Sequence, residues 1–335
     1  MRTAFLTGGT GFVGAHVARA LAREGWSVRL LARDPRRVEP SLISGQPIEV
    51  VVGGLDDRPA LSQAVAGAGA IVHVAGLTKA RTLSEYRDVN VGGTERLLEA
   101  ARDVAPGARF VLVSSQAAAG PSIGGQPVRH ADPARPVSWY GVSKREGEQA
   151  VERLWKGPWT VLRPGVVYGP GDRGLFVYFK LASSGWLPVP AGKSRIQLIG
   201  AERAAGGIAR AAAAPQLAGQ IRFLCDPDAV SLGQLASAIA VASGRRGRLI
   251  RVPDLVVRAL GGAETLVERV TRQSRPFNAD KARELLAGDW LCDAGPVDRE
   301  LDLPPPVPLS EGLAATWAWY RGAGWLPAGP QGAIL

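Results

Sequence analysis

A glycine-rich turn after the first apolar segment constrains the fold of this chain more than any other feature. The apolar segment covers residues 3–7, and Gly8, Gly11 and Gly14 follow it at intervals of three residues. An amphipathic stretch begins at once, over residues 12–24. Glycine permits the sharp turn and the close approach of a pyrophosphate, and a helix N-terminus offers free N–H groups to an anion. The turn therefore predicts a dinucleotide site in an α/β fold.

Short apolar runs alternate with helical patterns through the first half of the chain, as in repeated βαβ units. We expect six strands, at residues 3–7, 27–32, 48–52, 70–74, 109–114 and 159–163. We expect helices between them at 12–24, 57–66, 85–104 and 139–155. Right-handed crossovers would order these strands into a doubly wound parallel Rossmann sheet.

The second half is richer in Gly and Pro and carries shorter elements. The runs 195–199 and 221–224 are expected as strands that rejoin the sheet edge, and helices are expected at 231–243, 254–272, 279–287 and 310–320. We predict a dinucleotide-binding domain over 1–164, with 195–224 rejoining its sheet. Residues 165–194 and 225–322 form a smaller mixed C-terminal substrate-binding cap, and 323–335 form a loosely ordered tail.

The charge balance is basic, with 40 Lys and Arg against 30 Asp and Glu and a formal net charge of +10. The arginines are spread along the chain, and their densest cluster, at 245–251, contains no aromatic residue. We therefore favour a solvated arginine-rich surface over a nucleic-acid patch. An anionic cofactor, an anionic substrate and a membrane surface remain open as partners, because charge alone does not choose among them.

Composition narrows the class further. The chain is 46% hydrophobic and 21% charged, as soluble globular domains are, and its longest weakly polar stretch, 64–77, is too short to span a bilayer. No signal peptide precedes the first apolar run. Cys225 and Cys292 are far apart in the sequence and match no disulfide framework or zinc motif. We expect a cytoplasmic, metal-free protein without a transmembrane segment.

Arg33 bears on the choice of cofactor. It ends the second expected strand, where NAD enzymes usually carry an acid for the ribose hydroxyls. A guanidinium there can bind the 2′-phosphate of NADP with two hydrogen bonds. NADP(H) is therefore preferred and NAD(H) stays possible. In the alternative interpretation Arg33 is a surface residue and Asp34 contacts the ribose.

Tyr140 and Lys144 are four residues apart on an expected helix, hence on one face. A phenol has a pKa near 10, and a neighbouring ammonium favours its ionised form. Such a pair can move a proton to or from a carbinol oxygen while hydride moves on the same carbon. Ser114 and Ser115 end the fifth expected strand, at the sheet edge where ligands bind in such folds.

Together these motifs resemble the short-chain dehydrogenases/reductases, in the extended or atypical NAD(P)-dependent epimerase/dehydratase group. The glycine turn and the Tyr-x-x-x-Lys spacing match, as do Asn-Val-x-Gly-Thr at 90–94 and Arg-Pro-Gly-Val-Val-Tyr-Gly-Pro-Gly-Asp at 163–172. The family's catalytic serine stands five residues before a glycine, which selects Ser115 before Gly120. The match covers residues 1–322. One departure is Gly54, where the family usually has an acid for the adenine amine.

The resemblance implies roles for individual residues. The expected catalytic residues are Ser115, Tyr140 and Lys144. The expected cofactor contacts are Thr7, Gly8, Thr10, Gly11, Phe12, Val13, Gly14, Arg33, Leu55, Ala75, Gly76, Tyr140, Lys144, Pro164, Val166 and Val167. Asn90 is expected to hold the active-site backbone, and His73 is expected to be a satisfied core residue. Analogy with the family also suggests a homodimer through the two long helices after the fourth and fifth strands.

Three interpretations of the function are considered. The first is an NADP(H)-dependent alcohol/ketone oxidoreductase acting on a small, hydrophobic substrate, as in the 3β-hydroxysteroid dehydrogenase and dihydroflavonol reductase branch, which the segments 28–35 and 114–121 resemble. The second is a nucleotide-sugar epimerase, although Val166 replaces the Asn that holds the sugar diphosphate there. Gln116 and Ala117 replace the acid pair of the sugar dehydratases. The third is a non-catalytic NAD(P)-binding subunit or sensor, which would not need the three catalytic residues.

Overall fold

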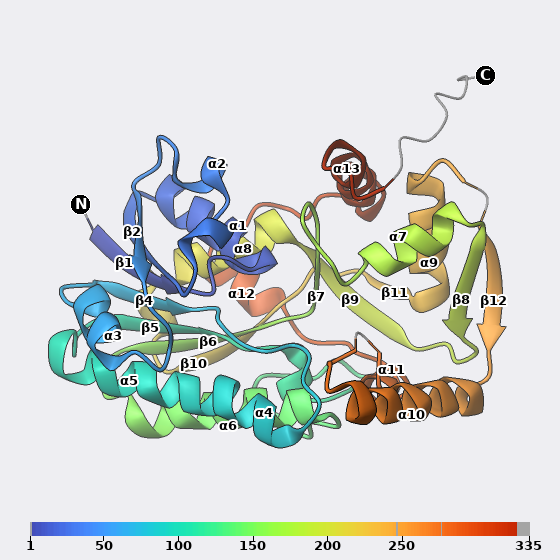
Figure 1. Cartoon of the computed structure of the whole chain (residues 1–335), viewed down its shortest axis with the longest axis horizontal. Helices are drawn as coiled ribbons and strands as arrows, with labels where there is room; N and C mark the ends of the chain where they lie inside the picture. Colours follow the sequence, from blue (N-terminus) through green and yellow to red (C-terminus); the bar gives the residue numbers. More distant parts are fainter. Residues whose placement is uncertain (1, 246, 276, 327–335) are drawn as a thin grey trace.

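The computed structural model describes residues 2–245, 247–275 and 277–326 of the chain. Its centre is a seven-stranded sheet in the order β10-β6-β5-β4-β1-β2-β3, with every pairing parallel (Figure 1). The strands are β1 (Arg2–Thr7), β2 (Trp26–Ala32), β3 (Ile48–Val52), β4 (Ala70–His73), β5 (Arg109–Val113), β6 (Trp159–Pro164) and β10 (Gln220–Leu224). The predicted doubly wound α/β fold is confirmed.

Helices cover both faces of this sheet (Figure 1). One face carries α1 (Phe12–Arg23), α8 (Ala201–Ala211) and α12 (Gly295–Glu300), and the other carries α3 (Arg58–Val65), α5 (Gly93–Val104) and α6 (Trp139–Leu154). Residues of one strand alternate between the two cores: Leu6 packs with the first face and Phe5 with the second. Because both faces are buried, the strands are almost continuously apolar.

Of the two later strands expected at the sheet edge, β10 lies there beside β6, and the prediction for the other is wrong. β9 (Arg195–Gly200) instead joins a three-stranded sheet between β11 (Ala229–Ser231) and β7 (Val166–Tyr168). The cause is Gly165, where the chain leaves β6 and enters β7: a Cβ there would meet the carbonyl oxygen of Gln197 at 2.8 Å. The backbone of β9 therefore crosses close to this point.

Helical segments also differ from expectation, and two of them bear on the fold of the central sheet. The helix expected over 85–104 is present but consists of α4 (Leu83–Arg87), a π-helical turn (Asp88–Gly92) and α5. The helix α8 was not expected, because it consists of alanine, glycine and charged residues, with Ile208 as its one large apolar side chain. The helix packs closely against the sheet, which favours small side chains: a Cβ on Gly207 would lie only 3.1 Å from the side chain of Leu224.

The remaining elements form a smaller layer beside the carboxyl ends of the strands. They are α7 (Phe176–Ser183), β8 (Trp186–Pro190), α9 (Leu232–Ala242), β12 (Arg248–Val252), α10 (Asp254–Thr271), α11 (Ala279–Leu285) and α13 (Leu309–Gly322). β8 and β12 pair in parallel. A third apolar cluster joins α7, α9 and α13. Most of the tail predicted over 323–335 lies outside the described residues, which end at Leu326.

The two cysteines are neighbours in the fold, although 67 residues separate them in the sequence. Cys225 follows β10 and Cys292 follows α11, and their sulfur atoms lie 2.7 Å apart. Both are free thiols in the protein interior, and burial raises the pKa of Cys292. Sequence separation is thus no guide to their distance. Among the described residues, no group of His, Cys, Asp and Glu has the arrangement of a metal site.

Candidate active site

The glycine turn after β1 leaves no room for side chains. Gly8 has φ +78°, and a Cβ on it would lie 2.6 Å from the amide nitrogen of Ala75. A Cβ on Gly14 would collide with the carbonyl oxygen of Gly8. The turn is closed by the Gly11 amide, which donates to the Gly8 oxygen at 2.9 Å. Positions 8 and 14 therefore require glycine.

The N-terminus of α1 is open to an anion. Its N-cap residue, Gly11, has no side chain to accept from the first-turn amides, and no acidic residue occupies that turn. Thr10 and Gly11 are exposed, and Phe12 and Val13 are half-buried. Free N–H groups, the helix dipole and a backbone stripped of side chains together fit the phosphates of a dinucleotide.

The loop after β4 lies directly beside this turn, because β1 and β4 are neighbours in the sheet. Thr7 accepts a hydrogen bond from the Ala75 amide at 3.2 Å through its hydroxyl. A Cβ on Gly76 would lie 3.7 Å from the ammonium nitrogen of Lys144. Ala75 and Gly76 therefore connect the glycine turn with the helix that carries Tyr140.

An open hollow of about 740 Å³ lies beyond the ends of β2 and β3, and Arg33 contributes to its wall. The carboxylate of Asp34 is already engaged by its own loop. It pairs with the Arg36 guanidinium at 2.9 Å and caps the following 3₁₀ turn. The hydrogen bond from Arg36 lowers the pKa of Asp34. This local pairing favours Arg33 over Asp34 as the residue available to a ribose substituent.

Sequence reasoning missed two residues of this hollow. The carboxylate of Asp56 fills the space next to Gly54, so an acid is present there although position 54 has none. Arg58 adds a second guanidinium to the wall that holds Arg33. The acidic run after Leu55 was the available signal for Asp56. The backbone oxygen of Leu55 accepts from Arg96 at 3.1 Å, and its side chain packs against Gly93.

Tyr140, Ser115 and Lys144 come together where β5 ends and α6 begins. The side chains of Tyr140 and Ser115 lie close enough to interact. Burial raises the pKa of Tyr140 to about 12, opposed by the interaction with Ser115 and assisted by the negative charge of Glu284. Lys144 donates to the backbone oxygen of Val113 at 2.7 Å. Burial lowers the pKa of Lys144 to about 8, and Glu148 opposes that shift.

A buried ion cluster beneath these residues ties three elements together. Glu148, one turn beyond Lys144 on α6, accepts from both arms of Arg163 on β6, at 2.9 and 2.7 Å. Ser114 at the end of β5 donates to the same carboxylate at 2.5 Å. Both charged side chains are almost inaccessible to water. A buried bidentate pair has a narrow geometry, so this cluster sets the register of α6 against β5 and β6.

A second polar network runs from the glycine turn to α6 through His73. Thr94 donates to the Asn90 oxygen, so the Thr94 hydroxyl accepts from Nε2 of His73 at 3.1 Å. Nδ1 of His73 then accepts from Thr7 at 2.6 Å. Burial, with the nearby Lys144 charge, lowers the pKa of His73 to about 3 and keeps the ring neutral.

Asn90 continues this network into α6. Its amide oxygen accepts from the Leu77 amide at 2.8 Å, and its nitrogen donates to Ser143 at 2.9 Å. Ser143 in turn donates to the backbone oxygen of Tyr140. Asn90 and His73 thus hold backbone and helix in the interior, as expected for both.

The segment after β6 completes the sheet edge. β5 and β6 pair through Val113 and Leu162, so Pro164 ends β6 beside the strand end that carries Ser115. Val166 and Val167 belong to β7 and pair with β9, and Val166 is 37% exposed. All three therefore lie at the same edge as Tyr140.

The cap supplies groups that the sequence did not identify. Asp280 on α11 accepts from the first backbone amide of α6, at Trp139, over 2.8 Å. Glu284, one turn later, is close enough to raise the pKa of Tyr140. Trp290 donates to the backbone oxygen of Glu284 at 3.1 Å. Nothing in the local sequence links α11 to α6, so these contacts depend on the tertiary fold.

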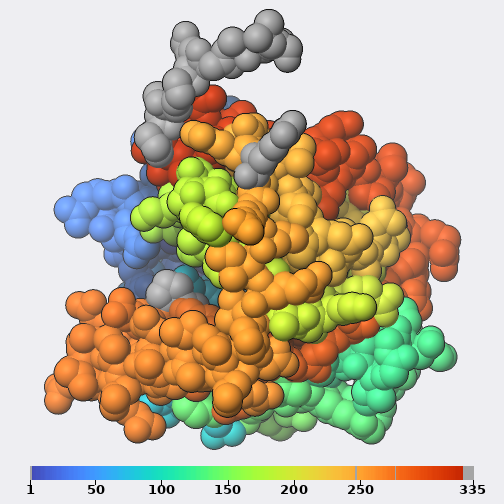
Figure 2. Space-filling view, turned by 90° about the vertical axis from the view of Figure 1, so that its right-hand side faces the viewer, coloured from blue at the N-terminus to red at the C-terminus, as the bar shows by residue number. Residues whose placement is uncertain are grey.

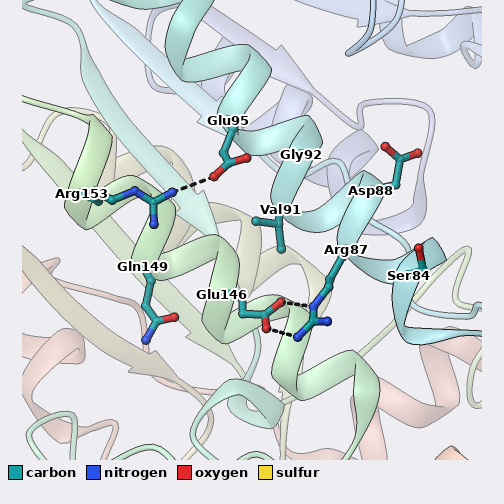
Figure 3. Close-up of a pocket in the computed structure, with 9 residues that line it drawn as sticks. All are labelled: Ser84, Arg87, Asp88, Val91, Gly92, Glu95, Glu146, Gln149 and Arg153. Atoms are coloured by element: carbon teal, nitrogen blue, oxygen red, sulfur yellow. Dashed lines mark hydrogen bonds and ion pairs between the residues drawn. The ribbon is translucent and has the colours of Figure 1, made fainter.

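A second open groove, of about 520 Å³, lies away from this edge, between the π-helical turn, α5 and α6 (Figure 3). Its side chains pair with one another across the groove: Arg87 with Glu146 at 2.6 Å, and Arg153 with Glu95 at 2.7 Å. The groove faces outward on the helix pair that family analogy assigns to a dimer. Its polar, internally paired lining carries no nucleophile–base pair.

The known proteins that are similar to this chain include two reductases. The chain is 39% identical over 326 residues to a ceramide reductase of Caulobacter vibrioides, covering 96% of this chain and 95% of that protein. It is 30% identical over 358 residues to a 4-hydroxy-2-methyl-3-oxo-4-farnesyl-3,4-dihydroquinoline-1-oxide ketoreductase of Stigmatella aurantiaca, covering 100% and 99%.

The fold is also that of solved structures. A dTDP-glucose 4,6-dehydratase of Streptomyces venezuelae, solved with NAD bound, superposes with a TM-score of 0.77 at 24% identity, covering 97% of this chain and 98% of that one. The model of the NAD dependent epimerase/dehydratase family matches residues 4–184. This chain is therefore an enzyme of the NAD dependent epimerase/dehydratase family.

Proposed function

We propose that this enzyme is an NADP(H)-dependent oxidoreductase that interconverts a ketone and an alcohol on a hydrophobic, lipid-like substrate. The observation that carries the proposal is the convergence of Tyr140 and Ser115, whose side chains lie close enough to interact, one helical turn from Lys144. When bound, the nicotinamide would supply or accept the hydride. The protein's own task is then to hold the substrate oxygen and to move one proton.

Tyr140 is the proton carrier in this proposal. Its pKa of about 12 keeps the phenol protonated near neutral pH, which suits donation to a substrate oxygen in the direction of ketone reduction. Ser115 would hold the same oxygen through its hydroxyl. Lys144, whose ammonium is already oriented by the Val113 oxygen, would stabilise the phenolate left after transfer.

The preference for NADP(H) is supported by the positive wall of the hollow beyond β2 and β3. Arg33 and Arg58 both contribute to it, while Asp34 is engaged by Arg36. Two guanidinium groups suit a 2′-phosphate, which an NAD-binding acid would repel. Glycines 8, 11 and 14, together with Thr7, Thr10, Phe12 and Val13, would bind the pyrophosphate side. Leu55, Ala75, Gly76, Pro164, Val166 and Val167 would contact the adenosine and nicotinamide ends.

Two observations support an apolar substrate. The ring of Tyr140 packs against the cap's apolar cluster, which includes Phe176, Tyr178 and Trp290. Phe179 of the same cluster is fully buried, so it belongs to the core and not to the wall of a crevice. The two relatives described above are named as reductases of a ceramide and of a farnesylated quinoline oxide. Both names denote molecules with long hydrocarbon chains.

The test is turnover by the purified protein, with NADPH or NADH and a panel of substrates. We expect NADPH oxidation with long-chain ketones, and no cofactor-enhanced binding of UDP or UDP-glucose in competition calorimetry. Tight UDP binding with epimerisation would replace this proposal by a nucleotide-sugar epimerase. Cofactor binding without turnover on any substrate would favour a binding subunit. The cytoplasmic location and the homodimer stay predictions, tested by fractionation and by light scattering.

A further inference from the structure

The helix α10 exposes an unusual face. Across its 18 residues, all of them described, burial is confined to Val257, Gly261 and Glu268. At 100° per residue these three lie within about 40° of one another, so the helix rests on the cap along one narrow line. Most of its circumference faces outward.

The outward side opposite that line is apolar. It consists of Leu255, Val256, Ala259, Leu260, Ala263, Leu266 and Val270. No charged residue of the helix falls within this arc of about 140°. Leu255 and Val270 are each 78% exposed and Leu266 is 61% exposed, the reverse of an ordinary surface helix, whose polar side faces water. Figure 2 shows the segment in orange across the lower part of the molecule.

Cations flank this apolar arc on one side and at both ends. Arg258 and Arg269 lie together on one side of α10, Arg248 and Arg251 lie on β12 just before it, and Arg272 follows it, all exposed. Of the acids of the helix, Asp254 is exposed in the first turn, Glu264 pairs with Arg275 at 3.1 Å, and Glu268 is buried against Asn278. The surface is therefore apolar in the middle, with more cations than free acids at its margin.

We propose that this face of α10 docks the protein onto the surface of an anionic phospholipid bilayer. Leucine and valine side chains would enter the headgroup boundary, and the arginines, with long apolar stems, would reach the lipid phosphates. Negative lipid headgroups are the partner that complements both the apolar arc and the positive margin. Across the described residues, no helix is both long and apolar enough to cross a membrane, so the docking lies in the plane of the surface.

The docking face adjoins the candidate active site. α10 and α11 are packed so closely that a Cβ on Gly261 would lie 2.8 Å from Cβ of Ala282. Thr265 accepts from the Ala279 amide at 2.9 Å, which fixes the two helices further. α11 in turn carries Asp280, which holds the start of the Tyr140 helix. A bilayer on the outward face would thus be separated from the Tyr140 helix by α10 itself and by α11.

Vesicle flotation of the full-length protein tests this surface. The probes are vesicles of phosphatidylcholine alone and vesicles with about one quarter phosphatidylglycerol. We expect flotation with the anionic vesicles and at least tenfold less with the neutral ones. The variant Leu255→Gln/Leu266→Gln/Val270→Gln should lose at least tenfold in partitioning, because three apolar side chains no longer enter the interface. The control is Ile123→Gln/Val307→Gln, which changes two apolar residues outside α10 that are 63% and 58% exposed.

The readout is independent of the proposed reaction, since flotation needs neither cofactor nor substrate. Retained flotation in the triple variant, or equal flotation by both vesicle types, would overturn the proposal. A wild-type dimer that the triple variant converts to monomer, without any vesicle binding, would assign the face to a second copy of the chain instead. Circular dichroism of the triple variant should match the wild type, because the altered side chains make few internal contacts. Turnover on a short, water-soluble ketone should also be unchanged.

Discussion

The carboxylate of Asp280 accepts a hydrogen bond from the backbone amide of Trp139 at 2.8 Å, so a residue of the cap binds the first turn of the helix that carries the candidate proton donor. Ser138 binds the same turn from within the chain, accepting from the Gly141 amide at 3.0 Å. An acid at a helix N-terminus is favoured by the helix dipole. The position of α11 is thereby coupled to that of the helix that carries Tyr140.

The first prediction concerns this contact. Replacing Asp280 with Ala should lower the free energy of unfolding by about 1–2 kcal/mol, the usual effect of losing a helix cap. It should also lower kcat more than it raises KM, because Tyr140 is displaced. Asp280→Asn keeps an acceptor oxygen and should recover most of both losses. Urea unfolding and steady-state kinetics measure the two effects. Equal damage from Ala and Asn would refute the capping role.

The second prediction concerns the variant Tyr140→Phe. The ring packing stays and the proton carrier is lost, so turnover should fall by about 10²–10⁴-fold while cofactor affinity is retained. Tyr178→Phe, another half-buried tyrosine of the cap cluster, is the matched control and should retain activity. Lys144→Ala should reduce both turnover and cofactor binding. Near-normal turnover in Tyr140→Phe would contradict the proposed mechanism.

The third prediction concerns the preference for NADP over NAD. Arg33→Ala should weaken NADP binding by about 1.5–3 kcal/mol and leave NAD binding nearly unchanged, because charge-assisted hydrogen bonds to the 2′-phosphate are lost. Arg58→Ala should act in the same direction. Arg37→Ala, an exposed arginine outside the hollow, serves as the control. Isothermal calorimetry gives all the affinities. An equal loss for both cofactors would speak against a 2′-phosphate site.

His73 supports a prediction on pH. Its pKa is about 3 in the folded protein and near 6.5 when unfolded, so the unfolded chain binds the proton first as pH falls. Between pH 7 and 5 this single group should lower the free energy of unfolding by about 2 kcal/mol. His73→Gln should reduce that dependence, whereas exposed His130→Gln should not. The test is urea unfolding at both pH values. The same change in the free energy of unfolding between pH 7 and 5 for all three proteins would contradict the role assigned to His73.

Features of the sequence that act over short distances were predictable. The Gly8 turn, the six first-half strands and the Tyr140–Lys144 spacing each depend on neighbours within one or two turns of chain, where backbone sterics and periodicity dominate. The family resemblance added Ser115, which the fold brings to Tyr140 because β5 ends beside α6. The sequence by itself therefore determined the fold class and the three candidate catalytic residues.

Only the tertiary structure decided which distant segments meet. β9 takes β7 as its partner because the chain leaves the sheet at Gly165, and the alanine-rich α8 packs where small side chains are needed. Asp280 reaches α6 across 141 residues, which no periodicity encodes. The sequence predicted a helix over 254–272 but no exposed apolar arc on it. Which side faces outward depends on its packing against α11, and burial is a property of the whole fold.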